Sequence, residues 1–210
     1  IICTEQRKKQ ILKARPRRLI VIHNSPQIPK NIDKLPRVSP RNTKKKRIVY
    51  VGILQDDRLL LEIAETIKHN STFELHIGGF GKYEKYFNEL SNKYKNIYFY
   101  GAMNYADVIK LESECDILFA TYNPSISNHK YSAPNKLYEA MALGKPIIVC
   151  KNTGIDSFVK ENNLGAVINY DAEEFIIKAK ELSDKDYSYS KILFNKEYSW
   201  EAMSEKLKEL

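Results

Sequence analysis

Cysteine is scarce in this chain: Cys3, Cys115 and Cys150 are odd in number and follow no spacing pattern. Three unpatterned cysteines exclude a disulfide framework and are typical of a protein in a reducing cytosol. No group of Cys and His residues has the spacing of a metal site, so no metal is expected.

Long apolar runs are also missing, because no stretch approaches the roughly 18–20 apolar residues that a membrane span needs. The first residues, Ile1-Ile2-Cys3, lack the basic-then-apolar pattern of a secretory signal. We therefore expect a cytoplasmic protein, and an opening without Met suggests a piece of a longer chain. The net charge of +8 favours anionic partners such as nucleotides, nucleic acid or acidic lipids. An equally good alternative is that the positive charge reflects a Lys-rich composition without functional meaning.

From Ile48 onward, short β-branched or aromatic runs alternate with segments whose apolar residues recur at helical spacing. Such βαβα repetition with short connections predicts an α/β fold: a doubly wound, Rossmann-like parallel sheet with helices on both faces. The expected strands are 48–51, 73–77, 97–100, 116–120, 146–149 and 166–168. The expected helices are 59–67, 83–94, 106–114, 134–143, 154–161, 172–182 and 200–210, with Trp200 packing the last of them.

The first forty residues differ from the rest. Residues 3–12 look helical and residues 19–22 look like a strand, after which four prolines punctuate a loop that ends at Pro40. We interpret residues 1–40 as the end of a preceding domain plus a linker, and residues 41–210 as the α/β domain. The run from Arg41 to Arg47 has no interleaved aromatics, so nucleic acid is not expected there. It is interpreted as a solvated linker, with contact to an anionic membrane as the alternative.

The most informative stretch is the predicted helix 134–143, which Pro134 begins and Gly144 ends. Its first turn offers free backbone N–H groups and the positive end of the helix dipole, which suit a phosphate. Asn135, Lys136 and Glu139 are spaced three and four apart and can share one face. The carboxylate of Glu139 could accept two vicinal hydroxyls, as in a ribose. A solvent-facing Lys136–Glu139 pair explains the spacing equally well.

The segment PNKLYEAMALGKPII, residues 134–148, resembles the donor-site helix of GT-B fold glycosyltransferases of the retaining family-4 type. IVYVG, LHIGGFG, IYFYGAM and CDILFATYNP resemble, in the same order, the strands and loops of that donor domain. The first twenty-five residues resemble the last helix of the acceptor domain and the crossing between domains, and YSWEAMSEKL resembles the helix that crosses back. The chain is thus identified as the C-terminal half of a GT-B fold.

The resemblance implies a role for each matched residue. Glu139 would bind the donor ribose, and Arg58 and Lys136 would bind the diphosphate. Backbone at Gly52, Gly79 and Gly81 would lie close to the donor, and the helix would begin beside it at Pro134 and Asn135. The loop that holds the base would comprise Gly101, Ala102 and Met103.

The implied reaction is sugar transfer from a nucleoside diphosphate sugar, with retention, to a polysaccharide or lipid-linked acceptor. Positive side chains and helix N–H groups would stabilise the leaving diphosphate, so neither a metal nor a cofactor is expected. The facing N-terminal domain would supply the acceptor site, and this chain alone should not turn over. A position just inside the cell membrane would suit a lipid-linked acceptor.

Two positions depart from the family pattern. Tyr131 stands where the first Glu of an E-x7-E motif is usual, and Ile53 replaces an Arg that often follows the glycine. Two alternatives therefore stay open: a non-hydrolysing sugar-nucleotide epimerase, and a relative that binds nucleotide sugars without turnover. His129 is interpreted as an ordinary loop histidine, with a place near the sugar as the alternative, and His23 and Asn24 as structural.

Overall fold

The computed structural model describes residues 1–40 and 44–208. Its centre is a parallel sheet of the strands β1 (Lys46–Leu54), β2 (Phe73–Gly81), β3 (Ile97–Phe99), β4 (Ile117–Ala120), β5 (Ile147–Cys150) and β6 (Gly165–Ile168). The strand order is β3-β2-β1-β4-β5-β6, so the chain first builds outward from β1 and then continues on its other side. β1 and β2 are paired in register from Lys46 and Phe73 to Leu54 and Gly81. The predicted doubly wound fold is confirmed.

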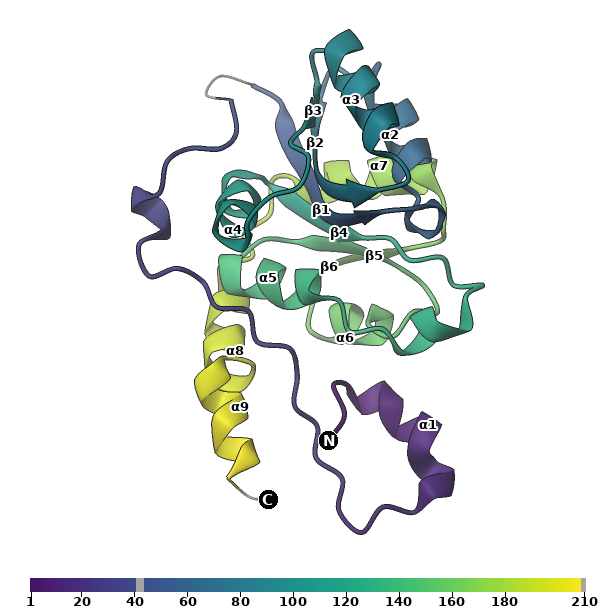
Figure 1. Cartoon of the computed structure of the whole chain (residues 1–210), viewed down its shortest axis with the longest axis vertical. Coiled ribbons are helices and arrows are strands. Elements are labelled where there is room, and N and C mark those ends of the chain that lie inside the picture. The colour runs from purple at the N-terminus through teal and green to yellow at the C-terminus, as the bar shows by residue number, and fades with distance from the viewer. Residues whose placement is uncertain (41–43, 209–210) are drawn as a thin grey trace.

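Helices cover both faces of this sheet (Figure 1). On one face lie α2 (Leu60–Ile67), α3 (Glu84–Lys93) and α7 (Ala172–Leu182). On the other lie α4 (Tyr105–Glu114), α5 (Asn135–Leu143) and α6 (Asp156–Glu161). The helices α8 (Tyr189–Glu197) and α9 (Trp200–Leu207) continue from the sheet towards the N-terminal segment, which contains α1 (Lys8–Ile11).

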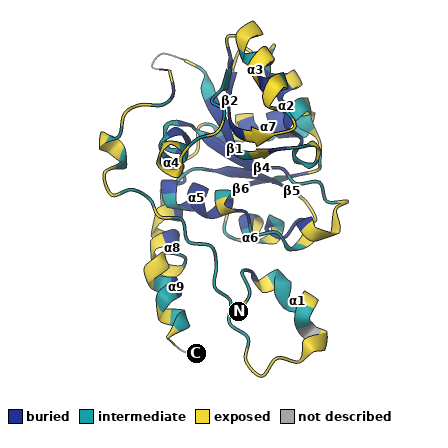
Figure 2. Cartoon of the chain, in the orientation of Figure 1, coloured by how far each residue is buried: buried dark blue, intermediate teal, exposed yellow. Residues whose placement is uncertain are grey.

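The two layers arise from strand alternation, since successive side chains of a strand point to opposite faces. In β1, Ile48 and Tyr50 are buried in the core beneath α2, α3 and α7, whereas Val49 and Val51 are buried against α4 and α5. Figure 2 shows the sheet as the most buried part of the chain and α1 and α9 as largely exposed or intermediate. The carboxyl ends of the central strands β1 and β4 are therefore supported by helices packed on both faces of the sheet.

Most predicted elements lie within a few residues of the observed ones. β1 and β2 extend further than predicted, because the glycines expected to end the strands continue the pairing to Leu54 and Gly81. The helix predicted over 3–12 is interrupted: α1 has four residues, flanked by 3₁₀ turns at Glu5–Arg7 and Leu12–Ala14. The strand predicted over 19–22 is reduced to a single bridge between Ile2 and Val21. Helix α8 was not predicted.

The predicted basic run 41–47 is only partly described, because residues 41–43 lie outside the described residues. Its last member is not solvated: Arg47 belongs to β1, is buried, and donates to the carbonyl oxygens of Pro40 and Glu114. The prediction that Trp200 packs the last helix is also wrong, because Trp200 is 52% exposed and Met203 is the buried residue of α9. Within the described residues, no helix combines the length and apolarity that crossing a bilayer demands.

Candidate functional site

The strand order places the candidate site between β1 and β4, where successive connections diverge to opposite faces of the sheet. In open α/β sheets, ligands bind in the crevice outside the carboxyl ends of the strands at such a switch point. Three segments meet there: the end of β1 at Gly52, the 3₁₀ turn Asp56–Arg58, and the N-terminus of α5.

Lys136 lies in the first turn of α5 and reaches across to the end of β1. Its ammonium donates to the Val51 carbonyl oxygen and lies 4.7 Å from the centroid of the Tyr50 ring. A Cβ on Gly52 would lie 3.3 Å from that ammonium nitrogen and 3.2 Å from the Tyr50 hydroxyl. A side chain at position 52 would therefore crowd the cation, which explains a glycine at this strand end.

Arg58 is 13% exposed and sits in a cluster of fixed partners. Its Nη1 lies 2.9 Å from Asp57 Oδ2 and 3.0 Å from His129 Nε2, and the guanidinium stacks 4.1 Å above the Tyr122 ring. Thr121 donates to the Arg58 carbonyl at 2.6 Å. Arg58 is therefore not a solvated arginine, and the Asp57 carboxylate already offsets part of its charge.

His129 is 6% exposed and is part of this cluster. Its Nδ1 lies 2.8 Å from the Asn123 carbonyl, which can only accept, so that nitrogen carries a proton. Its Nε2 lies 3.0 Å from both Arg58 Nη1 and Asp57 Oδ2, so it can accept from Arg58 or donate to Asp57. His129 thus contacts both members of the Arg58–Asp57 pair, which differs from the ordinary loop histidine expected from the sequence.

Glu139 is 3% exposed and faces α4, where the Tyr105 hydroxyl donates to its Oε1 at 3.2 Å. Burial raises the pKa of the Glu139 carboxyl, while Lys136 and the Tyr105 hydrogen bond act in the opposite direction. A solvent-facing Lys136–Glu139 pair is excluded, because Glu139 is buried and Lys136 bonds to Val51. Glu139 therefore faces α4, whereas Lys136 one turn earlier reaches β1.

The glycines at the end of β2 have a structural explanation. Gly79 has a φ of +121°, and a Cβ there would lie 1.8 Å from the Gly52 carbonyl oxygen. At Gly81, with a φ of +134°, the Cβ would lie 2.7 Å from the Leu54 carbonyl oxygen. Both residues continue the pairing with β1 and are not a separate turn. They allow the two strand ends to approach closely.

The remaining predicted residues lie in the loop after β3 and at the start of α5. The Gly101 carbonyl accepts from Gly79 N–H at 2.6 Å, which connects the loop 101–103 to β2, and Ala102 is exposed. Pro134 is the N-cap of α5, so the helix begins at Asn135, one residue later than predicted. Asn135 is exposed and accepts from Asn24 at 2.9 Å.

The segment that crosses from the N-terminal part docks on the same helix. His23 Nδ1 lies 2.8 Å from the Tyr138 hydroxyl, and Asn24 donates to the Ala133 carbonyl at 2.7 Å. Their structural role agrees with the expectation from the sequence. Because this segment contacts the N-terminus of α5, it helps to fix the position of Lys136 and Glu139.

Several residues of the site were missed by the sequence analysis, namely Tyr50, Asp57, Tyr105, Glu112 and Tyr122. Tyr50 lay within a predicted strand and Tyr105 just before a predicted helix, and aromatic residues at such positions are usually core residues. Asp57 could have been suspected, because an acid next to Arg58 at a strand end is a natural ion-pair partner. Glu112 gave no signal: a Glu in a surface helix is ordinarily solvated.

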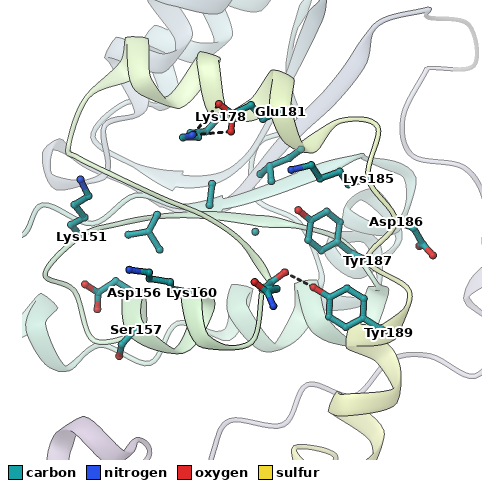
Figure 3. A pocket seen from close by; sticks show the side chains of 15 residues that line it. Lys151, Asp156, Ser157, Lys160, Lys178, Glu181, Lys185, Asp186, Tyr187 and Tyr189 are labelled. Carbon is teal, nitrogen blue, oxygen red and sulfur yellow. Dashed lines mark hydrogen bonds and ion pairs between the residues drawn. The ribbon is translucent and has the colours of Figure 1, made fainter.

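A groove of about 780 Å³ lies elsewhere, along the edge strand β6 between α6 and α7 (Figure 3). Lysines and acids from both helices line it, including Lys160, Lys178 and Glu181, together with Tyr187 and Tyr189. An Asp-Lys-Asp sequence at 184–186 borders this groove, and the Asp186 carboxylate accepts from Ser188. None of the predicted donor residues lines it. No cluster of three or more potential metal ligands occurs among the described residues.

The fold defines a class: a Rossmann-like α/β domain with Arg58, Lys136 and the buried Glu139 near its switch point. The family model Glycosyl transferases group 1 matches residues 31–192. The chain therefore belongs to this glycosyltransferase family. No curated protein sequence matches the chain.

Solved structures of GT-B glycosyltransferases share this fold. A mutant of S. aureus TarM, solved in complex with Fondaparinux, alpha-GlcNAc-glycerol and UDP, has a TM-score of 0.70 at 19% identity, over 99% of this chain and 42% of TarM. A glycosyltransferase from Rickettsia africae has a TM-score of 0.68 at 16% identity, over 98% of this chain and 60% of that one. WaaG, a glycosyltransferase involved in lipopolysaccharide biosynthesis, has a TM-score of 0.60 at 17% identity, over 99% of this chain and 60% of WaaG. The chain thus spans 42% to 60% of the length of these structures.

Proposed function

We propose that this chain is the donor-binding half of a glycosyltransferase that uses a nucleoside diphosphate sugar and retains the anomeric configuration. In the reaction, the bond between the anomeric carbon and the diphosphate oxygen breaks, and a bond to an acceptor hydroxyl oxygen forms. The acceptor hydroxyl loses a proton and the diphosphate leaves with the bonding electron pair. The acceptor would be a polysaccharide or glycolipid held by a facing N-terminal domain.

The site supplies positive charge where the diphosphate would leave. Lys136 and the first-turn N–H groups of α5 lie on one side, and Arg58 lies on the other. The two cations come close to the same aromatic residue, since Lys136 lies over Tyr50 and the Tyr50 hydroxyl is within hydrogen-bonding reach of Arg58. Fixed charges of this kind stabilise a developing anion without reorganising. We therefore propose a metal-independent transfer.

The buried position of Glu139 carries this proposal. A carboxylate that is 3% exposed and bonded by one tyrosine hydroxyl keeps acceptor positions for a ligand with paired hydroxyls. A glutamate that only faced solvent would not be buried in this way, because burying a carboxylate costs free energy. The ribose of a nucleotide has the required vicinal hydroxyls, and its diphosphate would extend towards Lys136.

Calorimetry tests the proposal with uridine, guanosine and adenosine diphosphates. At least one should bind wild type, and Glu139→Ala should weaken it by about tenfold to a hundredfold, the loss of one hydrogen bond or two to a charged group. Glu173→Ala removes an exposed acid of α7 and is the matched control. Unchanged binding by Glu139→Ala, or no binding by wild type, would refute the assignment.

Tyr131 favours one second candidate, a relative that binds nucleotide sugars without turnover, because it replaces a glutamate of the family motif. Turnover by the chain joined to its facing domain would exclude that candidate. An epimerase would convert a nucleotide sugar without any acceptor, so product analysis separates this third candidate. We further propose peripheral contact with anionic membrane through the basic run, in which Lys44 is exposed. Binding to anionic rather than neutral vesicles is the test.

A further inference from the structure

Glu112 of α4 is the most unusual charged residue among those described. Its side chain is completely buried, and neither carboxyl oxygen has a hydrogen-bond partner within the described chain. Two residues later, the Glu114 side chain is 8% exposed and well bonded: it accepts from the backbone N–H groups of Val38 and Ser39 and lies 3.6 Å from Lys110. Glu114 holds the linker to α4, whereas nothing in the fold explains Glu112.

Glu112 belongs to the helix face that meets the candidate site. Tyr105 and Glu112 are seven residues apart, which places them on the same side of α4, two turns apart. Tyr105 donates to Glu139 on the facing helix α5, and Lys136 lies one turn from Glu139. Glu112 faces the same space between the two helices, because the charges of Glu139 and Lys136 both act on its carboxyl group.

The charges in this space do not balance if both acids are ionised. Burial raises the pKa of Glu112 well above its usual range, the Glu139 charge raises it further, and Lys136 lowers it. The other titratable neighbours on α4, Tyr105 and Cys115, have pKa values raised by burial and stay neutral. On this face β1 contributes Val49 and Val51, and its Arg47 is bonded to Pro40 and Glu114. One cation thus faces two carboxyl groups.

We propose that Glu112 holds a proton and acts as a positioning residue for Glu139. The neutral acid can donate its O–H to the Glu139 carboxylate, which a second carboxylate could not do. Glu139 then stays anionic and oriented, with acceptor positions left for vicinal hydroxyls. The inference that Glu112 is protonated rests on the structure alone. The inference that it affects binding of a ribose-bearing ligand also rests on the proposed function.

Unfolding by urea at pH 5 and pH 8 tests whether Glu112 carries a proton in the folded protein. The folded pKa of Glu112 is raised above 4.5, so its favourable contribution is present at low pH and is lost as pH rises through the folded value. Glu112→Gln mimics the neutral acid and should gain stability relative to wild type between pH 5 and pH 8. Glu114→Gln, the matched variant on the same helix, should be less stable than wild type at both values. A Glu112→Gln variant that lost as much stability as Glu114→Gln at pH 8 would overturn the proposal.

Calorimetry with uridine, guanosine and adenosine diphosphates tests the positioning. Glu112→Gln keeps a donor and should bind within about twofold of wild type, whereas Glu112→Met fills the space without a donor and should bind about tenfold more weakly. Equal binding by Glu112→Met and wild type would refute the positioning role. If no diphosphate binds wild type, the proposed function and the positioning role both fail. The urea experiment still tests whether Glu112 is protonated.

Discussion

The ammonium of Lys136 lies 4.7 Å from the centre of the Tyr50 ring and is bonded to the carbonyl of the next residue, Val51. The ring itself is fixed, because the Tyr50 hydroxyl donates to the Ile53 carbonyl at 2.9 Å. Burial raises the pKa of Tyr50 to about 12, so the ring stays neutral and presents its face to the cation. The charge is thereby held at the end of β1 before any ligand arrives.

Lys136→Ala should weaken binding of a nucleoside diphosphate by about tenfold to a hundredfold, since a charge-assisted hydrogen bond is worth about 1.5–3 kcal/mol. Binding of the nucleoside alone should change little, because the cation is expected at the phosphates. Calorimetry of nucleoside and diphosphate at two salt concentrations measures both effects. The variant should also show a weaker salt dependence, as exposed charge attraction is screened over about 10 Å in 0.1 M salt.

Lys160→Ala, which removes an exposed lysine of α6, is the control for nonspecific loss of charge. It should leave the diphosphate affinity unchanged. An equal loss for nucleoside and diphosphate in Lys136→Ala would indicate a folding defect instead of a phosphate contact. No loss at all would place Lys136 outside the binding site.

Asp57 competes with any anion for Arg58, since the two side chains are 2.9 Å apart and both are largely buried. Asp57→Asn keeps the shape and removes the negative charge, so we expect several-fold tighter binding of a nucleoside diphosphate. Arg58→Ala should have the opposite effect. Calorimetry at low salt measures both, and weaker binding by Asp57→Asn would mean that Asp57 helps to orient Arg58 more than it opposes the ligand.

Gly79 and Gly101 should respond very differently to alanine, although both have positive φ. At Gly79 the added Cβ would lie 1.8 Å from the Gly52 carbonyl oxygen, whereas at Gly101 it would meet nothing within 4 Å. Gly101→Ala should cost about 1–2 kcal/mol, the ordinary left-handed penalty. Gly79→Ala should cost more than about 4 kcal/mol or prevent folding, because backbone must move. Denaturant unfolding of both variants measures the difference, and equal costs would contradict this account of the β1–β2 pairing.

The α/β core could be predicted because its strands are short apolar runs between amphipathic helices, and such alternation allows few other folds. The positions of Arg58, Lys136 and Glu139 followed from the strand ends and the helix start. Helix α8 could not be predicted in this way, since only Ser190 and Phe194 of it are buried. Its position depends on packing against α5, where Ser190 donates to the Met141 carbonyl. A local pattern contains no record of such a tertiary contact.

The burial of Glu112 and Glu139 was likewise invisible in the sequence. Helical spacing places Glu139 beside Lys136, and an exposed ion pair is the usual outcome of that spacing. The facing helix α4 decides otherwise, because it covers Glu139 and supplies the Tyr105 hydroxyl. Whether a helical glutamate is solvated or buried depends on which element packs over it, and that is a property of the assembled fold.

Acid should weaken the contact between the crossing segment and α5. Burial and the Lys206 charge lower the pKa of His23 from 6.5 to about 4, so the folded protein holds this ring neutral beside the Tyr138 hydroxyl. The contribution of His23 to stability is therefore complete above about pH 6.5 and is lost as pH falls towards 4. His23→Gln keeps a polar group at the position but has no such titration. Relative to wild type, this variant should gain stability between pH 7.5 and pH 4.5 in urea unfolding experiments. A constant difference between the two proteins across that range would show that the ring is protonated equally in the folded and unfolded chains.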